Sequence, residues 1–135
     1  MKLNNNLSLD SIKLPLGQFP VLYKDSFFID CLEQMTKFKI GTACVVDENL
    51  KLLGVITDGD IRRNLISSQK MFSNLAVEYC NTFKNDNSKF VKIHDSIDKV
   101  INIHITEKIW DLPIVDNDNK LLGLIHLNNV LKEIF

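Results

Sequence analysis

The residues best suited to chemistry stand together in one short run, Thr57-Asp58-Gly59-Asp60-Ile61-Arg62-Arg63. The run follows an apolar stretch, which indicates that a strand ends here and that a helix capped by Asp58 begins. A helix N-terminus presents unpaired N–H groups and a partial positive charge, so a phosphate is favoured there. Thr57 adds a hydroxyl donor, Asp60 a two-oxygen acceptor suited to a ribose diol, and Arg62 and Arg63 planar donors for phosphate. The run predicts a nucleotide-binding site.

The same residues also have explanations that need no ligand. Asp58 and Asp60 at the start of a helix are favourable as a cap and as partners of the helix dipole. Arg62 and Arg63 fit a solvated helix face or a dimer contact as well as a phosphate clamp. They are, however, the only arginines among 16 basic residues, which favours a role that needs a planar donor rather than a point charge.

This run closes one copy of an internal repeat. Residues 43–57 align with residues 112–126 at an offset of 69, and seven of the 15 positions are identical. In each copy an apolar run, a polar turn and a second apolar run predict a β-hairpin. Gly54 and Gly123 in the second strands indicate a bulge or a close backbone approach.

Helices are expected on both sides of each hairpin. One begins after Ser26, its expected N-cap, and its counterpart begins after Asp95 or Ser96. The helix that follows the first hairpin is expected to turn Ile61 and Leu65 inward, and an apolar stripe predicts a last helix near the end of the sequence.

The fold class expected from these elements is α/β, with two βαββα repeats. Short strands at 19–21 and 90–93 lead into the repeats. We divide the chain into a polar segment at 1–13 that frays, repeat 1 at 14–72 and repeat 2 at 73–135, with residues 81–89 as the most loop-like stretch.

The hairpin and the run after it resemble the CBS domain, a family named after cystathionine β-synthase. Its pattern, Gly-hydrophobic-x-Thr/Ser-x-x-Asp/Asn, is matched from Gly54 to Asp60. Two such units about 70 residues apart resemble a CBS pair, or Bateman module, over about residues 15–135. The run TDGDIRR is most similar to CBS pairs fused to bacterial sugar-phosphate nucleotidyltransferases or to isomerases of the arabinose-5-phosphate type.

The resemblance implies two repeats related by a pseudo-twofold axis, with a cleft between them that binds adenine nucleotides or related nucleotides and nucleotide sugars. Thr42 and Ala43 would line the base pocket by analogy, although as plain strand residues they need no ligand. The module would form a homodimer and modulate an attached or associated sugar-nucleotide enzyme. The alternative is a dimerisation scaffold whose ligand sites are vestigial.

The second copy departs from the pattern. His126 stands where repeat 1 has Thr57, and Asn129 stands where it has Asp60. Asn carries no charge, and His either fills the phosphate position or contacts phosphate when protonated. We therefore expect one competent site, in repeat 1, and a degenerate one in repeat 2.

Composition argues against several other classes of function. A formal net charge of −1 without a segregated basic face argues against nucleic-acid binding, and the short apolar runs argue against a membrane span. Three cysteines without CxxC spacing and a polar N-terminus favour a cytoplasmic protein. His94, His104 and His126 lack partners at metal-ligand spacing, and Trp110 is expected in a core or an interface. No catalytic dyad is visible, so neither an enzyme nor a cofactor is predicted.

Overall fold

The computed structural model describes residues 7–67, 81–82 and 90–134. Among these, the residues of 16–85 form one compact unit, the repeat 1 unit, and those of 1–15 and 86–135 form a second, the repeat 2 unit. Each unit contains a four-stranded sheet and helices, so the predicted α/β class is confirmed. The boundary predicted at 72/73 lies outside the described residues and stays a prediction.

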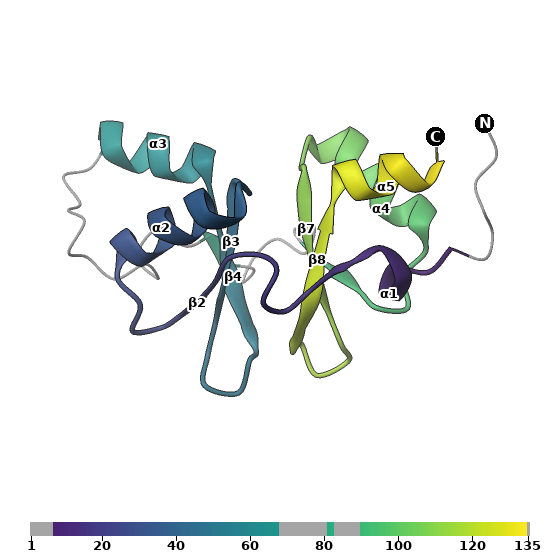
Figure 1. Ribbon diagram of the computed structural model, residues 1–135, viewed down its shortest axis with the longest axis horizontal. Helices are drawn as coiled ribbons and strands as arrows, with labels where there is room; N and C mark the ends of the chain where they lie inside the picture. The colour runs from purple at the N-terminus through teal and green to yellow at the C-terminus, as the bar shows by residue number, and fades with distance from the viewer. Residues whose placement is uncertain (1–6, 68–80, 83–89, 135) are drawn as a thin grey trace. The chain divides into compact units, whose positions relative to one another are not determined.

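The repeat 1 unit is built on the predicted hairpin. Its sheet has the order β2 (Val21–Tyr23), β3 (Thr42–Val46), β4 (Leu52–Thr57) and β5 (Asn81–Thr82). The first pair of neighbouring strands is parallel and the others are antiparallel. Helices α2 (Phe28–Phe38) and α3 (Asp58–Ser67) lie on the same face of this sheet (Figure 1). All five residues of β3, which lies between β2 and β4, are buried.

The repeat 2 unit has the same core arrangement. Its sheet has the order β1 (Leu14–Pro15), β8 (Leu121–His126), β7 (Asp111–Val115) and β6 (Val91–Lys92), and its helices are α1 (Leu9–Ile12), α4 (Ile97–Glu107) and α5 (Leu127–Ile134). β7 is fully buried, as β3 is. Within the described residues, no helix is long and apolar enough to cross a bilayer.

The turns of the two hairpins are built in the same way. In the first, the Asp47 carboxylate accepts the backbone N–H groups of Asn49 at 2.8 Å and Lys51 at 2.9 Å. Asp116 makes the equivalent bonds in the second turn. This use of an Asp side chain to bond the backbone N–H two residues on is a common device of tight turns. It explains why Asp47 and Asp116 are among the identical positions of the repeat.

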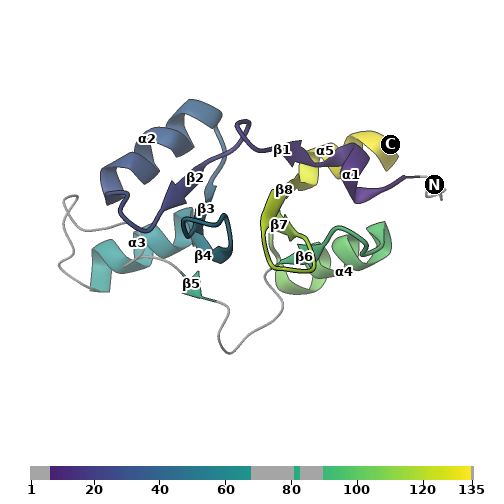
Figure 2. The same cartoon turned by 90° about the horizontal axis from the view of Figure 1, so that it is seen from below.

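Residues 7–13 differ from the expectation that the N-terminal segment frays, whereas residues 1–6 lie outside the described residues. Leu9 and Ile12 of α1 are buried in the core of the repeat 2 unit. β1 follows and pairs antiparallel with β8, Leu14 opposite Leu124 and Pro15 opposite Gly123 (Figure 2). A Cβ at Gly123 would lie 2.6 Å from the carbonyl oxygen of Leu14, so a glycine is required for this approach. The close backbone approach predicted for Gly123 is therefore confirmed.

One of the predicted caps of the helices before the hairpins is wrong. The Ser26 hydroxyl accepts the backbone N–H of Tyr23, while α2 begins one residue later and the Asp30 carboxylate accepts the N–H of Phe27 at 2.8 Å. In repeat 2 these tasks fall to other residue types. Asp95 accepts the N–H of Lys92, and Ser96 is the N-cap of α4, as one of the two predicted alternatives had it.

Some further expectations also need correction. Leu65 of α3 is exposed rather than turned inward, whereas Ile61 packs against the repeat 1 core. The first of the short strands that lead into the repeats is shifted to Val21–Tyr23, whereas the second, Val91–Lys92, lies within the predicted 90–93. Within the loop-like stretch 81–89, the first two residues form a strand and the others lie outside the described residues.

Candidate functional site

The centre of the predicted site is a hydrogen-bonded pair at the junction of β4 and α3. The Asp60 carboxylate accepts the backbone N–H and the hydroxyl of Thr57, both at 2.8 Å, through Oδ2. In return the Thr57 hydroxyl accepts the N–H of Asp60 at 3.2 Å. This reciprocal pattern is a capping box, with Thr57 as N-cap and Asp60 three residues on. The predicted cap, Asp58, is therefore wrong: it is the first residue of the helix.

The second oxygen of Asp60 holds Arg63. Arg63 donates to Oδ1 at 2.7 Å, one helical turn along α3. The Asp60 side chain is 6% exposed, whereas that of Arg63 is 63% exposed. The nearly buried Asp60 carboxylate thus binds the exposed guanidinium of Arg63 near the N-terminal end of α3.

The other predicted residues of repeat 1 surround this centre unevenly. Thr42 lies opposite Thr57 across the β3–β4 pair and is buried. Ala43 is fully buried in the repeat 1 core. Arg62 is exposed and makes no hydrogen bond or ion pair with any other residue that the structure describes. Thr42, Thr57, Asp60 and Arg63 therefore lie around the junction of β4 and α3. Arg62, which sequence reasoning grouped with them, makes no hydrogen bond to this group.

Asp58 packs against Gly41, a residue that sequence reasoning missed. A Cβ at Gly41 would overlap the Asp58 carboxylate, so the glycine leaves room for it. The backbone N–H of Asp58 donates to the carbonyl of Gly41 at 3.0 Å. Burial, together with the nearby Asp58 charge, raises the pKa of the Cys31 thiol to about 12. Cys31 therefore stays protonated near neutral pH and is a packing residue rather than a nucleophile.

The corresponding junction of repeat 2 is filled by a different pair. His126 Nδ1 lies 2.5 Å from the Oδ1 of Asp111, and these two residues face each other across β7 and β8. They occupy the positions of Thr57 and Thr42. The Asp111 side chain is 5% exposed and that of His126 is 25% exposed. Asp111 was missed, although the repeat offset that aligns it with Thr42 could have found it.

A second histidine of repeat 2 lies close to this pair. His104 of α4 is buried, its Nδ1 bonds to the carbonyl of Ile109, and its Nε2 has no hydrogen-bond partner among the described residues. Since a carbonyl only accepts, Nδ1 carries the proton and Nε2 is bare. Burial lowers the pKa of His104, and the charge on His126 lowers it further against the opposing effects of Ile109 and Asp111.

The neutral state of His104 predicts a loss of stability in mild acid. The unfolded chain binds a proton at this residue near pH 6.5, whereas the folded chain resists it to lower pH. The free energy of unfolding should therefore fall as pH drops below about 6.5, by at most about 1.4 kcal/mol per pH unit from this group. Repeat 1 has Met35 at the equivalent position, so His104→Met should flatten this part of the curve.

Urea unfolding between pH 8 and 5 measures the effect of His104. His94→Gln is the matched control, because His94 is an exposed histidine of the same unit and its loss should leave the pH dependence in place. An equally steep acid loss in His104→Met would contradict the account.

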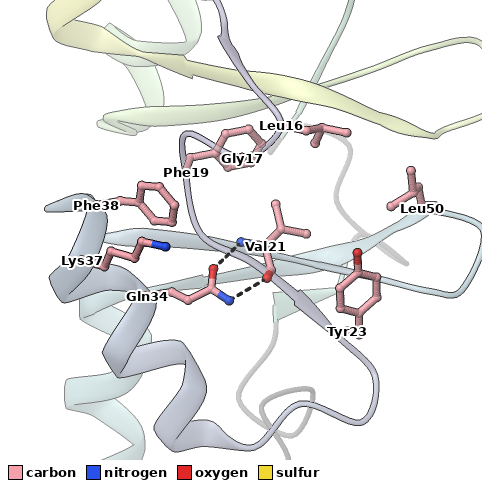
Figure 3. Close-up of a pocket in the computed structure, with 9 residues that line it drawn as sticks. All are labelled: Leu16, Gly17, Phe19, Val21, Tyr23, Gln34, Lys37, Phe38 and Leu50. Carbon is pink, nitrogen blue, oxygen red and sulfur yellow. Dashed lines mark hydrogen bonds between the residues drawn. The ribbon is translucent and has the colours of Figure 1, made fainter.

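A cavity of about 380 Å³ in the repeat 1 unit runs along the outer edge of β2 (Figure 3). None of the predicted site residues lines it. The side-chain amide of Gln34 bonds to both the N–H and the C=O of Val21, at 3.1 Å each, across this edge. Gln34 therefore closes the edge of the sheet against strand addition. The lining residues are Leu16, Gly17, Phe19, Val21, Tyr23, Gln34, Lys37, Phe38 and Leu50.

Two further predictions concern Trp110 and the side chains that could bind a metal ion. Trp110 is 63% exposed, so the core alternative is wrong, and the interface alternative stays a prediction. In the part of the chain that the structure describes, no three His, Cys, Asp or Glu side chains are grouped so that they could hold a metal ion.

The two hairpins and the helix junctions correspond to a known family. The CBS domain model matches residues 13–67 and again residues 82–135. The chain belongs to the CBS domain family. Its two copies form a tandem CBS pair, as the resemblance of the run from Gly54 to Asp60 had indicated.

Relatives and solved structures agree with this assignment. A probable arabinose 5-phosphate isomerase of Haemophilus influenzae is 30% identical over 112 residues, 83% of this chain and 32% of the isomerase. The CBS domains of a transcriptional regulator from Streptococcus pneumoniae superpose with a TM-score of 0.80 at 19% identity, covering 95% of this chain and 99% of theirs. The CBS-pair protein CBSX2 of Arabidopsis thaliana, solved in complex with AMP, has a TM-score of 0.78 at 22% identity and covers 96% of both chains.

These similarities cover part of the relatives' length and are low in sequence identity to the solved structures. The chain spans about a third of the length of the curated relatives it matches. The similarity to the two structures, below 25% identity, shows the fold of this CBS pair.

Proposed function

We propose that this chain is a regulatory module whose first repeat binds an adenine nucleotide or a related nucleotide or nucleotide sugar. The observation that carries the proposal is the junction of β4 and α3, where Thr57, Asp60 and Arg63 form one hydrogen-bonded group at a helix N-terminus. A CBS pair of the same fold that was solved with AMP supports the ligand class.

Each group at the junction has a defined task in this proposal. The N-terminus of α3 attracts the phosphate, and the Thr57 hydroxyl, which donates its one proton to Asp60, holds that carboxylate in place. The Asp60 carboxylate, already held in place by Thr57, accepts the hydroxyls of the ribose. Thr42 at the start of β3 provides the wall for the base, whereas Ala43 is fully buried in the repeat 1 core. Arg62 and Asp58 stay predictions from sequence and are not part of this group.

Repeat 2 has no equivalent acceptor group in this proposal. The Asp111–His126 pair takes the place of two threonines, and Asn129 replaces the carboxylate of Asp60. A buried hydrogen-bonding partner, Asp111, holds His126 where repeat 1 has a small hydroxyl. We therefore propose one nucleotide site per chain rather than two equal ones.

Binding would act through a change in conformational populations. A ligand shifts an equilibrium only as far as its affinities for two states differ, so the nucleotide must favour one arrangement of the module. The relation to a probable arabinose 5-phosphate isomerase supports an attached or associated sugar-phosphate or sugar-nucleotide enzyme as the regulated partner. The chain itself is then a sensor and not the catalyst.

A homodimerisation scaffold is the second candidate. Leu65 and Ile66 of α3 are 52% and 80% exposed, and Ile105 of α4 is 70% exposed. Leu65 and Ile66 are neighbours in the sequence, and exposed apolar side chains of this kind favour a covering partner. Light scattering tests this candidate, since a monomer at micromolar concentration would exclude a scaffold that works by self-association.

A thermal-unfolding screen of the full chain tests the proposed function. AMP, ADP, ATP, GTP, CTP, UTP and several nucleotide sugars are added singly. A ligand at about 100 times its Kd should add about 2.7 kcal/mol to the free energy of unfolding, which raises the Tm by several degrees. A flat response to every nucleotide, from a chain that unfolds cooperatively, would overturn the proposal.

A further inference from the structure

The outer edge of β2 carries four polar backbone groups that face away from the repeat 1 sheet. β2 is the end strand of that sheet, and the C=O of Pro20, just before it, accepts the N–H of Cys44 in β3 at 3.0 Å. Successive residues of a strand direct their N–H and C=O groups to opposite edges, so Val21 and Tyr23 direct theirs outward. An edge of this kind is a template for another strand unless its groups are bonded within the chain.

Two residues of the repeat 1 unit bond all four of these groups. The Gln34 amide accepts the N–H of Val21 through Oε1 and donates to its C=O through Nε2, both at 3.1 Å (Figure 3). The Ser26 hydroxyl accepts the N–H of Tyr23, and the Ser26 N–H donates to the C=O of Tyr23, both at 3.0 Å. Ser26 belongs to the turn that follows β2, whereas Gln34 reaches the edge from α2.

Repeat 2 keeps one of these two arrangements. Asp95, at the position of Ser26, accepts the N–H of Lys92 at 2.8 Å and donates its own N–H to the C=O of Lys92 at 2.9 Å. Ile103 stands at the position of Gln34 and packs against the repeat 2 core. The fold of a repeat therefore does not require an amide at this position, and Gln34 needs an explanation that is specific to repeat 1.

The surface beside the edge provides that explanation. The cavity of about 380 Å³ along β2 is lined mainly by apolar side chains, and Leu16 and Tyr23 on its wall are 43% and 47% exposed. A second copy of the chain fits this edge, because two antiparallel copies of β2 that meet at Val21 exchange both N–H···O bonds about a twofold axis. The two groups used in that exchange are the two that Gln34 bonds.

We propose that the outer edge of β2 is a latent pairing surface for a second copy of this chain, and that Gln34 keeps it closed. A side-chain amide has the donor and the acceptor of a peptide group, so Gln34 competes directly with an incoming strand. In the wild-type chain, pairing must first break two hydrogen bonds, whereas without the amide the Val21 groups are bonded only to water. The inference does not depend on nucleotide binding.

Sedimentation equilibrium of the full chain tests the inference, with the wild-type mass at each concentration as the reference. Gln34→Met removes the amide at a similar side-chain length, and Gln34→Ala removes it without adding an apolar side chain. Both variants should self-associate at least about tenfold more tightly than the wild-type chain, because two hydrogen bonds to the partner no longer replace two within the chain.

Hydrogen exchange of the Val21 amide identifies the surface that pairs. In the wild-type chain Gln34 should protect this amide at every concentration. In Gln34→Met and Gln34→Ala it should exchange rapidly in dilute solution and become protected as the concentration rises.

Two variants separate edge pairing from lost stability and from added hydrophobicity. Gln34→Lys loses the same two bonds but places a charge on the edge, which opposes strand pairing, so it should keep the wild-type mass. Thr36→Met adds an apolar side chain at an exposed position of the same helix and should also keep it. Urea unfolding confirms that each variant is folded at the concentrations used.

Three results would overturn the inference and leave the proposed function untouched. The first is wild-type association in the folded Gln34→Met and Gln34→Ala variants. The second is a gain in association that Gln34→Lys or Thr36→Met shares. The third is association that leaves the exchange of the Val21 amide independent of concentration.

Discussion

Replacing Asp60 with alanine is expected to weaken nucleotide binding at least about a hundredfold, because the carboxylate organises the whole junction. It holds Thr57 through Oδ2 and Arg63 through Oδ1. Each hydrogen bond to a charged acceptor contributes about 1.5–3 kcal/mol, and a hundredfold loss corresponds to about 2.7 kcal/mol. Asp60→Asn, which copies Asn129 of repeat 2, keeps the acceptor oxygen and loses the charge. It should lie between the two, about tenfold weaker than wild type.

The Asp60 variant also removes a helix cap, so binding must be separated from stability. Losing a cap costs about 1 kcal/mol of folding free energy. Ser96→Ala is the matched control, since Ser96 caps α4 in repeat 2 by accepting the N–H of Lys99. It should cost a similar amount and leave nucleotide affinity unchanged. Calorimetry and urea unfolding on the three variants measure both quantities, and wild-type affinity in Asp60→Ala would contradict the site assignment.

The second large effect is expected at Gly123. Gly123→Ala should lower the free energy of unfolding by about 2–3 kcal/mol, because the new Cβ meets the backbone oxygen of Leu14 at 2.6 Å. A backbone carbonyl cannot rotate away as a side chain can, so β1 must separate from β8. Hydrogen exchange of the backbone amides of residues 9–14 should rise in the same variant.

Gly41→Ala is the matched control for Gly123→Ala. Its Cβ would also overlap a neighbour, but that neighbour is the carboxylate of the exposed Asp58, the end of a flexible side chain. The side chain can swing into solvent, so the expected loss is below about 1 kcal/mol. Equal losses of stability in both variants, measured by urea unfolding, would show that the approach of β1 to β8 is not what Gly123 is needed for.

Much of the fold was predictable because the chain repeats itself. The two hairpins, at 42–57 and 111–126, end within a residue or two of the apolar runs that predicted them. The strands β1 and β5 were not predicted, since a two-residue strand has no periodicity of its own and forms only where a neighbouring strand offers an edge. Gly123 indicated that something approached β8 closely, without indicating what.

The caps and the site show a finer limit. Ser26 and Asp95 are equivalent, and both accept the N–H of the residue three positions before them, so residue type alone suggested the wrong helix start. Thr57 and Asp60 were grouped correctly as neighbours at a helix start. Their mutual hydrogen bonding depends on side-chain geometry that the spacing of the residues does not show.

Repeat 2 could have been interpreted further from its sequence. The replacement of Thr57 by His126 was visible, but its partner change, Thr42 to Asp111, became meaningful only when the β7–β8 register placed the two side by side. An alignment of the two repeats shows that both members of this cross-strand pair change between the repeats. The buried His104 interacts electrostatically with Asp111 and His126. Repeat 1 has an apolar residue, Met35, packed in the core at the equivalent position.

The most direct test of the account is the stoichiometry of nucleotide binding to the full chain by isothermal titration calorimetry, using the nucleotide that raises the Tm most. We expect one site per chain, lost in Asp60→Ala and unchanged in Asn129→Ala. Two equal sites per chain, or binding that Asn129→Ala abolishes and Asp60→Ala spares, would contradict the assignment of the ligand to repeat 1.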